Sequence, residues 1–589
     1  MLSAGFDDKA KYEEIMARVI DGTDEDCIRF TGIDYSSTCV YNWPLPEHLR
    51  VLCDLAVIYV RGKGFDKEKI KSLLLCGVNE WVKNDYICNS WWMNEINTPW
   101  ALSDLCMLIW DLLDDVQKKW VNIIVGRGSM RYNLDVRLEW TGANLMWGAN
   151  TSIKHAIFLD DAEYMRQIAD RMYYEIDFLP EGIQKDGSFF QHGPRQYAGG
   201  YGRVFIRESI RLLEILDGTS FALSDEKRDV FEFHILDGIR WMIHRSMYDW
   251  CVCGREFSRH DWGGAGSIGG AIDNYLKLTI PKRREELEKM RDAIKADEIS
   301  ADGVKYFPIG RLMATHTGGI YIGFQGIGPK ILTNEVCCDE GKLCANMSYG
   351  TTTCVMNSGK EYFEISPIWN YSHVPGTTTR DETDDEVYSQ VNNCNTFQKG
   401  DRFDGAQLGD CAYSAQTVRH NGITATVVAF GTPWGVAILG SGIESEKGEA
   451  LITTVEQCFY AGQHTADEKL VVHNGVKYVS LDCATRFVTT AEHRTGSWRR
   501  NNPSVAEEIS EGDVFTVTLD RDHDGYAYLI QPESIGGKFD VIENTADVQI
   551  IKIPDGRIFA HFFTDCEYIL PNGRIVQGEK NKCVVLDKE

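Results

Sequence analysis

The segment PKRREELEKMRDAIKAD, residues 281–297, separates two parts of the chain with different hydrophobic patterns. It is dense in charged residues, which is typical of a solvated helix or a linker. Before it, apolar residues recur at helical spacing, and after it short alternating or β-branched runs are separated by turns. The sequence therefore predicts a helical domain over residues 1–280, a linker over 281–302 and an antiparallel β domain over 303–589.

Two apolar stripes show the helical pattern of the first part. Thr98 and Pro99 predict the start of one helix, with a capping hydroxyl followed by a proline in the first turn. Its stripe consists of Leu102, Leu105, Leu108, Ile109 and Leu112. The second stripe consists of Phe205, Ile206, Ile210, Leu213 and Leu216. Gly218 follows this stripe, as a glycine often does at the end of a helix.

The second part of the chain has the pattern of strands joined by turns. Turn-forming residues such as Gly431-Thr432-Pro433 separate the runs. The predicted strands are Gly319–Phe324, Thr424–Phe430, Gly435–Leu439, Phe515–Leu519 and Tyr526–Ile530. Together the two patterns give an α+β, multidomain fold class.

Composition narrows the function and the location. The 589 residues include 61 Lys and Arg against 87 Asp and Glu, a net charge of −26, which argues against a sequence-independent nucleic-acid binder. An acidic sugar stays compatible, because a local cationic cleft can form on an acidic protein. No apolar run approaches the ~20 residues of a membrane span, and no signal peptide is visible. The 18 cysteines show no disulfide framework, so we expect reduced thiols and a cytoplasmic location.

Two motifs have the spacing of cofactor or metal sites. Gly264–Gly269 matches G-x-G-x-x-G, but no buried strand precedes it, so we interpret it as a loop with a close backbone approach. Asp520-x-Asp522-x-Asp524-Gly525 matches half of a calcium loop, but its twelfth position is Gln531. A hairpin turn is the simpler interpretation of that loop. We expect that no cofactor is required, with structural calcium at this loop as the less favoured alternative.

The residues around His192 favour an active site. His192 and Tyr201 are separated by a glycine-rich connection that suits a loop better than a helix, and such a pair can transfer protons. A structural role for the histidine is the alternative. Arg195 and Arg203 nearby favour an anionic substrate.

Other segments could contribute binding groups. Trp91 and Trp92, beside amide and carboxylate groups, could stack on a sugar ring or fill a helical core. Asn144 could donate to a carboxylate or cap a helix. Arg255 and Arg259 are four residues apart and could face one site or form surface ion pairs.

In order along the chain, these motifs resemble polysaccharide lyase family 8, which includes hyaluronate, chondroitin AC and xanthan lyases. In the first part they are Trp91-Trp92 with Glu95-Ile96-x-Thr98-Pro99, Thr141-Gly142-Ala143-Asn144, Asp186-Gly187-Ser188-Phe189-x-Gln191-His192, Tyr201-Gly202 and Gly254-Arg255-x-x-Ser258-Arg259. In the second part they are Trp369 with Val374–Thr378, Leu439–Ile443, Thr453–Gln457 and Tyr526–Ile530. The resemblance implies an incomplete α/α toroid followed by an antiparallel β-sandwich that contributes Glu335 to the cleft, with a shortened C-terminal β region.

The resemblance also implies a reaction, the β-elimination of a 4-linked uronic acid. Asn144, assisted by His192, would bind the uronate carboxylate and stabilise the developing negative charge. Tyr201 would protonate the leaving oxygen. Either Tyr201 or neutral His192 would remove the C5 proton, and we favour Tyr201 as both base and acid, supported by Arg255 and Glu335. The implied substrate-binding residues are Trp91, Trp92, Gln191, Arg195 and Arg259.

The chain departs from the family pattern at Cys338, where relatives have asparagine, so its specificity is not determined by the motifs. Hyaluronan- or chondroitin-type oligosaccharides are the first expectation, and a xanthan side chain that ends in mannosyl-glucuronate is the second. A glycoside hydrolase would need two positioned carboxylates, for which Asp186 and Glu335 are candidates. A non-catalytic glycan-binding relative is the remaining alternative. The sequence does not predict the oligomeric state or endo versus exo action.

Overall fold

A computed structural model describes most of the chain, in two compact units. The described residues are 8–40, 42–130, 140–328, 331–332, 335–337, 339–390, 402–521 and 523–587, so Cys338 and Asp522 lie outside them. One unit comprises Met1–Glu175 with Arg211–Leu223, and the other comprises Ile176–Ile210 with Ser224–Glu589. The helical segments after residue 224 therefore group with the strands. This boundary differs from the change of sequence pattern near residue 300.

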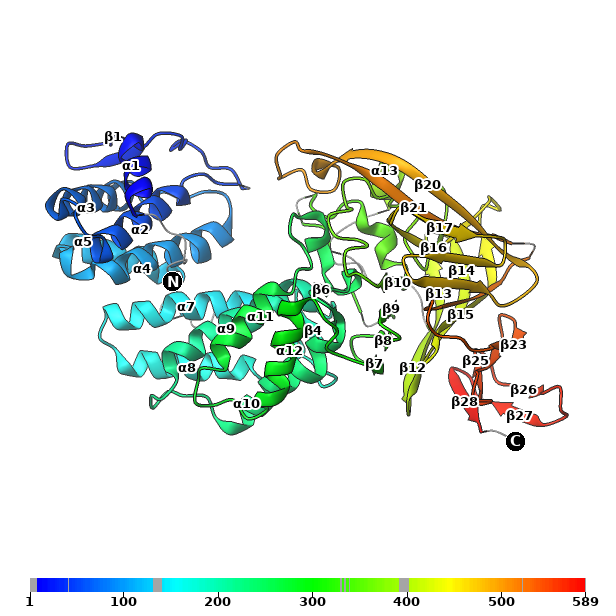
Figure 1. Cartoon of the computed structure of the whole chain (residues 1–589). Coiled ribbons are helices and arrows are strands. Elements are labelled where there is room, and N and C mark those ends of the chain that lie inside the picture. Colours follow the sequence, from blue (N-terminus) through cyan, green and yellow to red (C-terminus); the bar gives the residue numbers. More distant parts are fainter. Residues whose placement is uncertain are drawn as a thin grey trace. The chain divides into compact units, whose positions relative to one another are not determined.

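The first unit is built from helices that pack in pairs (blue to cyan in Figure 1). Its helices are α1 (Asp8–Arg18), α2 (Pro46–Arg61), α3 (Lys67–Asn84), α4 (Thr98–Ile109), α5 (Asp115–Arg127), α7 (Gly142–Phe158) and α8 (Ala162–Glu175), with a small hairpin of β1 (Val19–Asp21) and β2 (Ile28–Phe30). Helices α2, α4 and α7 contact one another in that order, and α3, α5 and α8 each pack on the helix before them. This alternation is the arrangement of an α/α toroid. No helix in the described part of the chain is both long enough and apolar enough to span a bilayer.

The start of α4 differs from the sequence prediction. The helical backbone already begins at Trp91 and continues through a π-helical segment, Met93–Asn97. Thr98 is buried inside this helix and does not cap it. Its N–H bonds to the carbonyl of Met93, five residues back, and this wider turn accommodates Pro99, which has no N–H to donate. The cap motif therefore marks a π-turn within a longer helix.

The second unit begins with short strands and helices. These are β3 (Gly182–Ile183), β4 (Phe189–Phe190), α10 (Asp225–Phe233), β5 (Ile243–His244), β6 (Met247–Tyr248), α11 (Gly266–Tyr275) and α12 (Arg284–Ala296). Helix α9 (Arg203–Leu216) has its first part, through Ile210, in this unit and its last turns in the first unit. Helix α9 follows the predicted stripe, and Gly218 after it has a positive φ of 71°. Helix α12 occupies the charged segment 281–297 and packs on α11. Its face of Leu287, Met290 and Ile294 is buried, so this segment is a packed helix.

The glycine-rich motif at residues 264–269 spans the start of α11 rather than a loop. A Cβ at Gly264 or Gly266 would make no close contact, whereas one at Gly269 would lie 3.3 Å from Ile294 of α12. Helix packing therefore explains Gly269, and a close backbone approach explains none of Gly264, Gly266 and Gly269.

The rest of the second unit is antiparallel β structure (green to red in Figure 1). Sheet β10-β9-β8-β7 contains β7 (Gly303–Phe307), β8 (Leu312–Thr317), β9 (Ile320–Gly326) and β10 (Thr351–Met356). Sheet β12-β13-β14-β15-β22-β19-β18-β17 contains β12 (Arg402–Leu408), β13 (Cys411–His420), β14 (Ile423–Thr432), β15 (Gly435–Ser445), β17 (His464–Ala466), β18 (Leu470–His473), β19 (Val476–Ser480) and β22 (Tyr526–Pro532). Sheet β11-β16-β21-β20 contains β11 (Thr378–Thr379), β16 (Ile452–Phe459), β20 (Thr485–Ser497) and β21 (Ile509–Arg521).

The end of the chain forms a small additional β region. It contains a sheet of β23 (Asp540–Asn544), β24 (Val548–Lys552), β25 (Ile558–Phe562) and β28 (Lys582–Leu586), with a hairpin of β26 (Cys566–Ile569) and β27 (Ile575–Gly578). Phe539, Ile551 and Phe559 of this region pack in one core with residues of the long sheet such as Phe430 and Leu439. Burial of these aromatic and aliphatic side chains fixes the C-terminal sheet against its neighbour.

All five predicted strands are present, in β9, β14, β15, β21 and β22. The helical N-terminal part followed by antiparallel β structure is therefore confirmed. The hairpin interpretation of residues 520–525 is wrong, because β21 and β22 on either side of it belong to different sheets. This segment is a crossing between sheets.

Candidate active site

The loop before His192 is held by one aspartate. Asp186 Oδ1 accepts hydrogen bonds from the N–H and hydroxyl of Ser188, at 3.0 and 2.6 Å. Its Oδ2 accepts from the backbone N–H groups of Ile309 and Gly310, at 2.6 and 2.9 Å. Asp186 therefore ties the β3–β4 hairpin to the β7–β8 turn. Its carboxylate serves as a backbone acceptor, which does not fit the acid or base of a hydrolase.

His192 lies at the end of this hairpin and contacts Glu335. Its Nδ1 is 2.5 Å from Glu335 Oε1. Because an ionised carboxylate can only accept, Nδ1 carries the hydrogen, and a ring with no second hydrogen leaves Nε2 as an acceptor. The His192 side chain is 29% exposed and the Glu335 side chain 7%, so the imidazole can reach a substrate while its partner stays buried.

Tyr201 lies beside this imidazole. It belongs to a π-helical segment, Ala198–Gly202, which precedes α9. The rings of His192 and Tyr201 are 4.7 Å apart, and Arg255 Nη2 donates to the Tyr201 oxygen at 2.9 Å. Since the phenol oxygen accepts from Arg255, its own hydrogen can be donated to another group. The structure thus brings together an imidazole acceptor and a phenol donor.

Arg255 is held by two carboxylates. One of its terminal nitrogens bonds to Glu335 Oε2, and its Nε donates to Glu340 Oε2 at 2.9 Å. Glu340 also binds Arg259, whose Nε is 2.5 Å from Oε1. Asn502, which follows β20, reaches the same oxygen with its amide at 3.4 Å. Two glutamates and two arginines thus form an ion-pair network that contacts Tyr201 through Arg255 and is buried except at Arg259.

The charges of this network fix the protonation of its members. Burial opposes ionisation of Glu335, but the His192 hydrogen bond and the Arg255 charge outweigh it and lower its pKa to about 2. Burial also opposes ionisation of Glu340, and the Arg259 hydrogen bond and charge lower the pKa of that carboxyl below its ordinary value. Burial raises the pKa of Tyr201, although the positive charge of Arg255 acts in the opposite direction. Tyr201 is therefore protonated at neutral pH, and both glutamates are ionised.

The predicted substrate-binding residues of this unit have partners inside the protein. Gln191 is 1% exposed and its amide donates to Glu181 at 2.7 Å. Arg195 is 3% exposed, lies 3.7 Å from Glu335 and donates to the carbonyl of His192 at 3.0 Å. The structure therefore gives Gln191 and Arg195 supporting positions. Arg259 is 39% exposed but is paired with Glu256 and Glu340.

The remaining predicted residues belong to the first unit. Trp91 is 51% exposed and lies 6.3 Å from the Trp140 ring, and Trp92 makes an edge contact with Trp147. Asn144 is half-buried in the first turn of α7, near the positive end of the helix dipole. Asn144 belongs to a different unit from His192 and Tyr201, so its convergence with them stays a prediction.

Two residues of the cluster received no role in the sequence analysis. Tyr197 is fully buried, donates to Glu335 Oε2 at 3.2 Å and accepts from the Arg255 N–H at 3.2 Å. Glu340 is the second acceptor for Arg255. The spacing of Arg255 and Arg259, with two glutamates five residues apart later in the chain, is a signal that could have identified Glu340.

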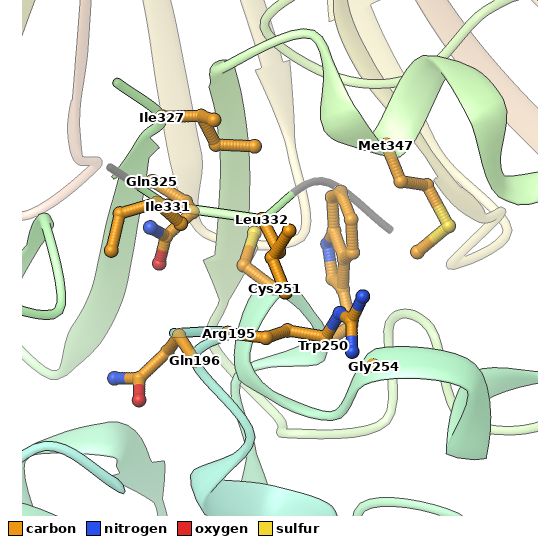
Figure 2. A pocket seen from close by; sticks show the side chains of 10 residues that line it. All are labelled: Arg195, Gln196, Trp250, Cys251, Gly254, Gln325, Ile327, Ile331, Leu332 and Met347. Carbon is orange, nitrogen blue, oxygen red and sulfur yellow. The ribbon is translucent and has the colours of Figure 1, made fainter. Parts of the chain in front are cut away.

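A small cavity lies next to this cluster (Figure 2). It has a volume of about 50 Å³ and is lined by Arg195, Gln196, Trp250, Cys251, Gly254, Gln325, Ile327, Ile331, Leu332 and Met347. The indole N–H of Trp250 and the amide oxygen of Gln325 have no hydrogen-bond partner among the residues that the structure describes. A cavity of this size accommodates water and excludes a sugar ring. This cavity is therefore too small to hold a sugar, and the exposed side of His192 is the accessible part of the cluster.

Comparison with known proteins decides the family. Residues 36–296 match the N-terminal α-helical domain of polysaccharide lyase family 8, and residues 302–539 match its super-sandwich domain. The chain belongs to polysaccharide lyase family 8. Enzymes of this family are carbon–oxygen lyases that act on polysaccharides. The predicted family and enzyme class are confirmed.

Individual relatives of this family 8 chain cover most of its length. It is 24% identical to chondroitinase-AC of Pedobacter heparinus over 85% of this chain and 74% of that protein. It is 22% identical to a hyaluronate lyase of Staphylococcus aureus, over 79% and 66% of the two chains. A chondroitinase AC lyase structure superposes with a TM-score of 0.88 at 21% identity, covering 99% and 90%. A Paenibacillus xanthan lyase structure has a TM-score of 0.79 at 18% identity, covering 96% and 61%.

Proposed function

We propose that this family 8 lyase cleaves 4-linked uronic-acid glycans of the hyaluronan or chondroitin type by β-elimination. The observation that carries this proposal is the pairing of an imidazole acceptor with a protonated phenol, 4.7 Å apart, beside buried and fixed positive charges. The reaction removes the proton at C5 and expels the oxygen at C4. It leaves a C4=C5 double bond on the uronate product.

We assign the two proton transfers to different residues. His192 Nε2 takes the C5 proton, because Glu335 holds Nδ1 and leaves Nε2 as the acceptor. Tyr201 gives its proton to the leaving oxygen, because burial keeps it protonated at neutral pH. This differs from the sequence-based preference for Tyr201 as both base and acid, since burial outweighs the effect of Arg255 on Tyr201.

The alternative mechanism gives both roles, base and acid, to Tyr201. It is supported by the Arg255 hydrogen bond, which would stabilise a phenolate. Substitution of His192 by Ala separates the two. If His192 is the base, kcat falls by about 10²–10⁴ and added imidazole restores part of it. Turnover within about tenfold of the wild type would assign the base to Tyr201.

The remaining residues provide binding and electrostatic support. Asn144 would hydrogen-bond the uronate carboxylate, and such a donor can contribute about 3–4 kcal/mol to transition-state stabilisation. The exposed ring of Trp91 offers a surface for a sugar face. No step of the proposed β-elimination needs a cofactor.

The substrate class is supported by the relatives. The sequence similarity to chondroitinase-AC extends over 85% of this chain, whereas the similarity to a xanthan lyase extends over 29%. Chondroitin or hyaluronan fragments are therefore preferred over a xanthan side chain. The test is a panel of acidic glycans scored by ultraviolet absorbance and product mass. Products that end in a saturated uronic acid would contradict β-elimination.

We further propose that the enzyme acts in a reducing, cytoplasmic compartment on imported oligosaccharides. Cys253, Cys354, Cys411 and Cys458 are buried free thiols, and burial raises the pKa of each of them. Turnover of a tetrasaccharide should then equal or exceed turnover of the polymer. Strong preference for long polymer would contradict this location.

A further inference from the structure

The backbone at His192 has a strained conformation. Its φ is +58°, in the left-handed region, which costs most residues other than glycine about 1–2 kcal/mol. Such strain persists only where surrounding contacts enforce it, and it concentrates at functional sites. The contacts that hold this backbone therefore determine where the imidazole lies.

One carboxylate, Glu181, holds the N-terminal side of this conformation. Its Oε1 accepts from the His192 N–H at 2.8 Å and from the Gln191 amide at 2.7 Å. Its Oε2 accepts from the Gly193 N–H at 2.9 Å. Hydrogen bonds to an ionised acceptor are stronger than those between neutral groups. Three donors around the strained residue thus converge on one side chain.

The other two sides of His192 are held by different residues. Arg195 donates to its carbonyl at 3.0 Å, and Glu335 accepts from its imidazole at 2.5 Å. Arg195 also lies 3.7 Å from Glu335, so its loss would disturb the Glu335 carboxylate. Neither of the Glu181 oxygens has a hydrogen bond to Glu335, Arg255 or Tyr201 among the described residues. Glu181 therefore offers a way to alter the His192 backbone with the ion-pair network left in place.

We propose that Glu181 is a positioning residue for catalysis: it fixes the left-handed backbone of His192 and thereby aims the imidazole at the substrate. This inference rests on the proposed role of His192 in β-elimination. A group displaced by about 1 Å can cost about 10²-fold in rate. The Glu181 bonds to the His192 and Gly193 N–H groups reach the imidazole through the His192 backbone, and this gives Glu181 a kinetic signature that a general loss of stability lacks.

The test is a double-mutant cycle of Glu181→Gln and His192→Ala in the full chain. A glutamine at 181 directs an N–H₂ group toward one of the backbone N–H donors. One of the hydrogen bonds that hold the His192 backbone is then lost without a change in side-chain volume. Glu181→Gln alone should lower kcat by about 10- to 100-fold with KM changed less than about threefold. In the His192→Ala background the same substitution should change kcat less than about twofold, because the group that it positions is absent.

Several results would overturn the proposal. One is an unchanged kcat for Glu181→Gln. Another is an equal loss of kcat when Glu181→Gln is introduced into the wild type and into His192→Ala. Full activity of His192→Ala alone would instead contradict the role of His192 on which this inference rests and would assign the base to Tyr201. Glu226→Gln on the exposed face of α10 is the control and should match the wild type.

A crystal structure of Glu181→Gln covers the case in which His192→Ala is too slow to measure. The imidazole should move out of hydrogen-bond distance of Glu335, and an unmoved imidazole would overturn the proposal. If Glu181→Gln does not fold, Glu181→Asp keeps the charge but shortens the reach, and should lower kcat to an intermediate level. Wild-type kcat in Glu181→Asp would then count against the proposal.

Discussion

Substitution of Glu335 by Gln tests the electrostatics of the site through protein stability. The carboxylate is 7% exposed, and its interactions with His192, Arg255 and Arg195 lower its pKa from 4.5 to about 2. That depression corresponds to roughly 3 kcal/mol of folding free energy at neutral pH, at about 1.4 kcal/mol for each unit. Arg255 keeps Glu340 as a partner in the variant, which limits the loss. We expect Glu335→Gln to be destabilised by about 2–3 kcal/mol.

The sign of the pH dependence follows from the direction of the shift. A carboxyl whose pKa is depressed in the folded state stabilises the protein above its unfolded pKa, and this stabilisation is lost as the pH falls toward the folded value. The difference in unfolding free energy between the wild type and Glu335→Gln should therefore be largest at neutral pH. It should narrow as the pH is lowered from about 4.5 toward 2.

Urea unfolding at a series of pH values measures this difference. The matched control is Glu579→Gln, whose side chain is 72% exposed and which should change stability by less than about 0.5 kcal/mol. A destabilisation of Glu335→Gln that is equally small, or one that does not narrow on acidification, would refute the network described here. Loss of activity with unchanged stability would show that the carboxylate supports catalysis through His192 and Arg255 without contributing to folding.

Four further substitutions test other parts of the structure. Tyr201→Phe should lower kcat by at least about 10² in the ultraviolet product assay, with a thermal midpoint close to that of the wild type, since Arg255 keeps two carboxylate partners. Asp186→Asn should lower stability by about 1–3 kcal/mol in urea, because one of its oxygens becomes a donor facing backbone N–H groups. Glu456 is fully buried, and burial raises its pKa to about 7. The unfolding free energy of the wild type should therefore decrease by roughly 3 kcal/mol as the pH rises from about 4.5 to 7, and that of Glu456→Gln should change less over the same range. Trp91→Ala should raise KM several-fold with unchanged stability, since its ring is 51% exposed, and an unchanged KM would remove it from the binding surface.

The sequence predicted the parts of the fold that depend on local patterns. The stripe that ends before Gly218 became α9, and alternating runs such as Thr424–Phe430 lie within single strands. Local patterns also located His192 and Tyr201, because the motif that ends at His192 and the glycine-rich connection to Tyr201 lie in one continuous segment. The division of the chain into units could not be predicted from local patterns, since it depends on distant contacts. Asp186, for example, bonds to Ile309 and Gly310, more than 120 residues later.

Other features depended on contacts between distant residues. The raised pKa of Tyr201 results from burial, which no spacing of Arg255 and Tyr201 in the sequence reveals. The π-turn before Pro99 uses the same residues as a capped helix start, so the sequence alone favoured the commoner structure. Gln191 carried a family motif, yet its amide is turned inward to Glu181.

The carboxylates that hold Arg255 come from the β part of the chain, after the three side chains that they support. During synthesis, His192, Tyr201 and Arg255 leave the ribosome before Glu335 and Glu340 exist, so the buried guanidinium has no counter-charge until the first β strands have been made. A truncated product that ends near residue 300 would contain those three reactive groups and still lack an assembled centre. Assembly of this site is therefore coupled to synthesis of the chain beyond residue 340.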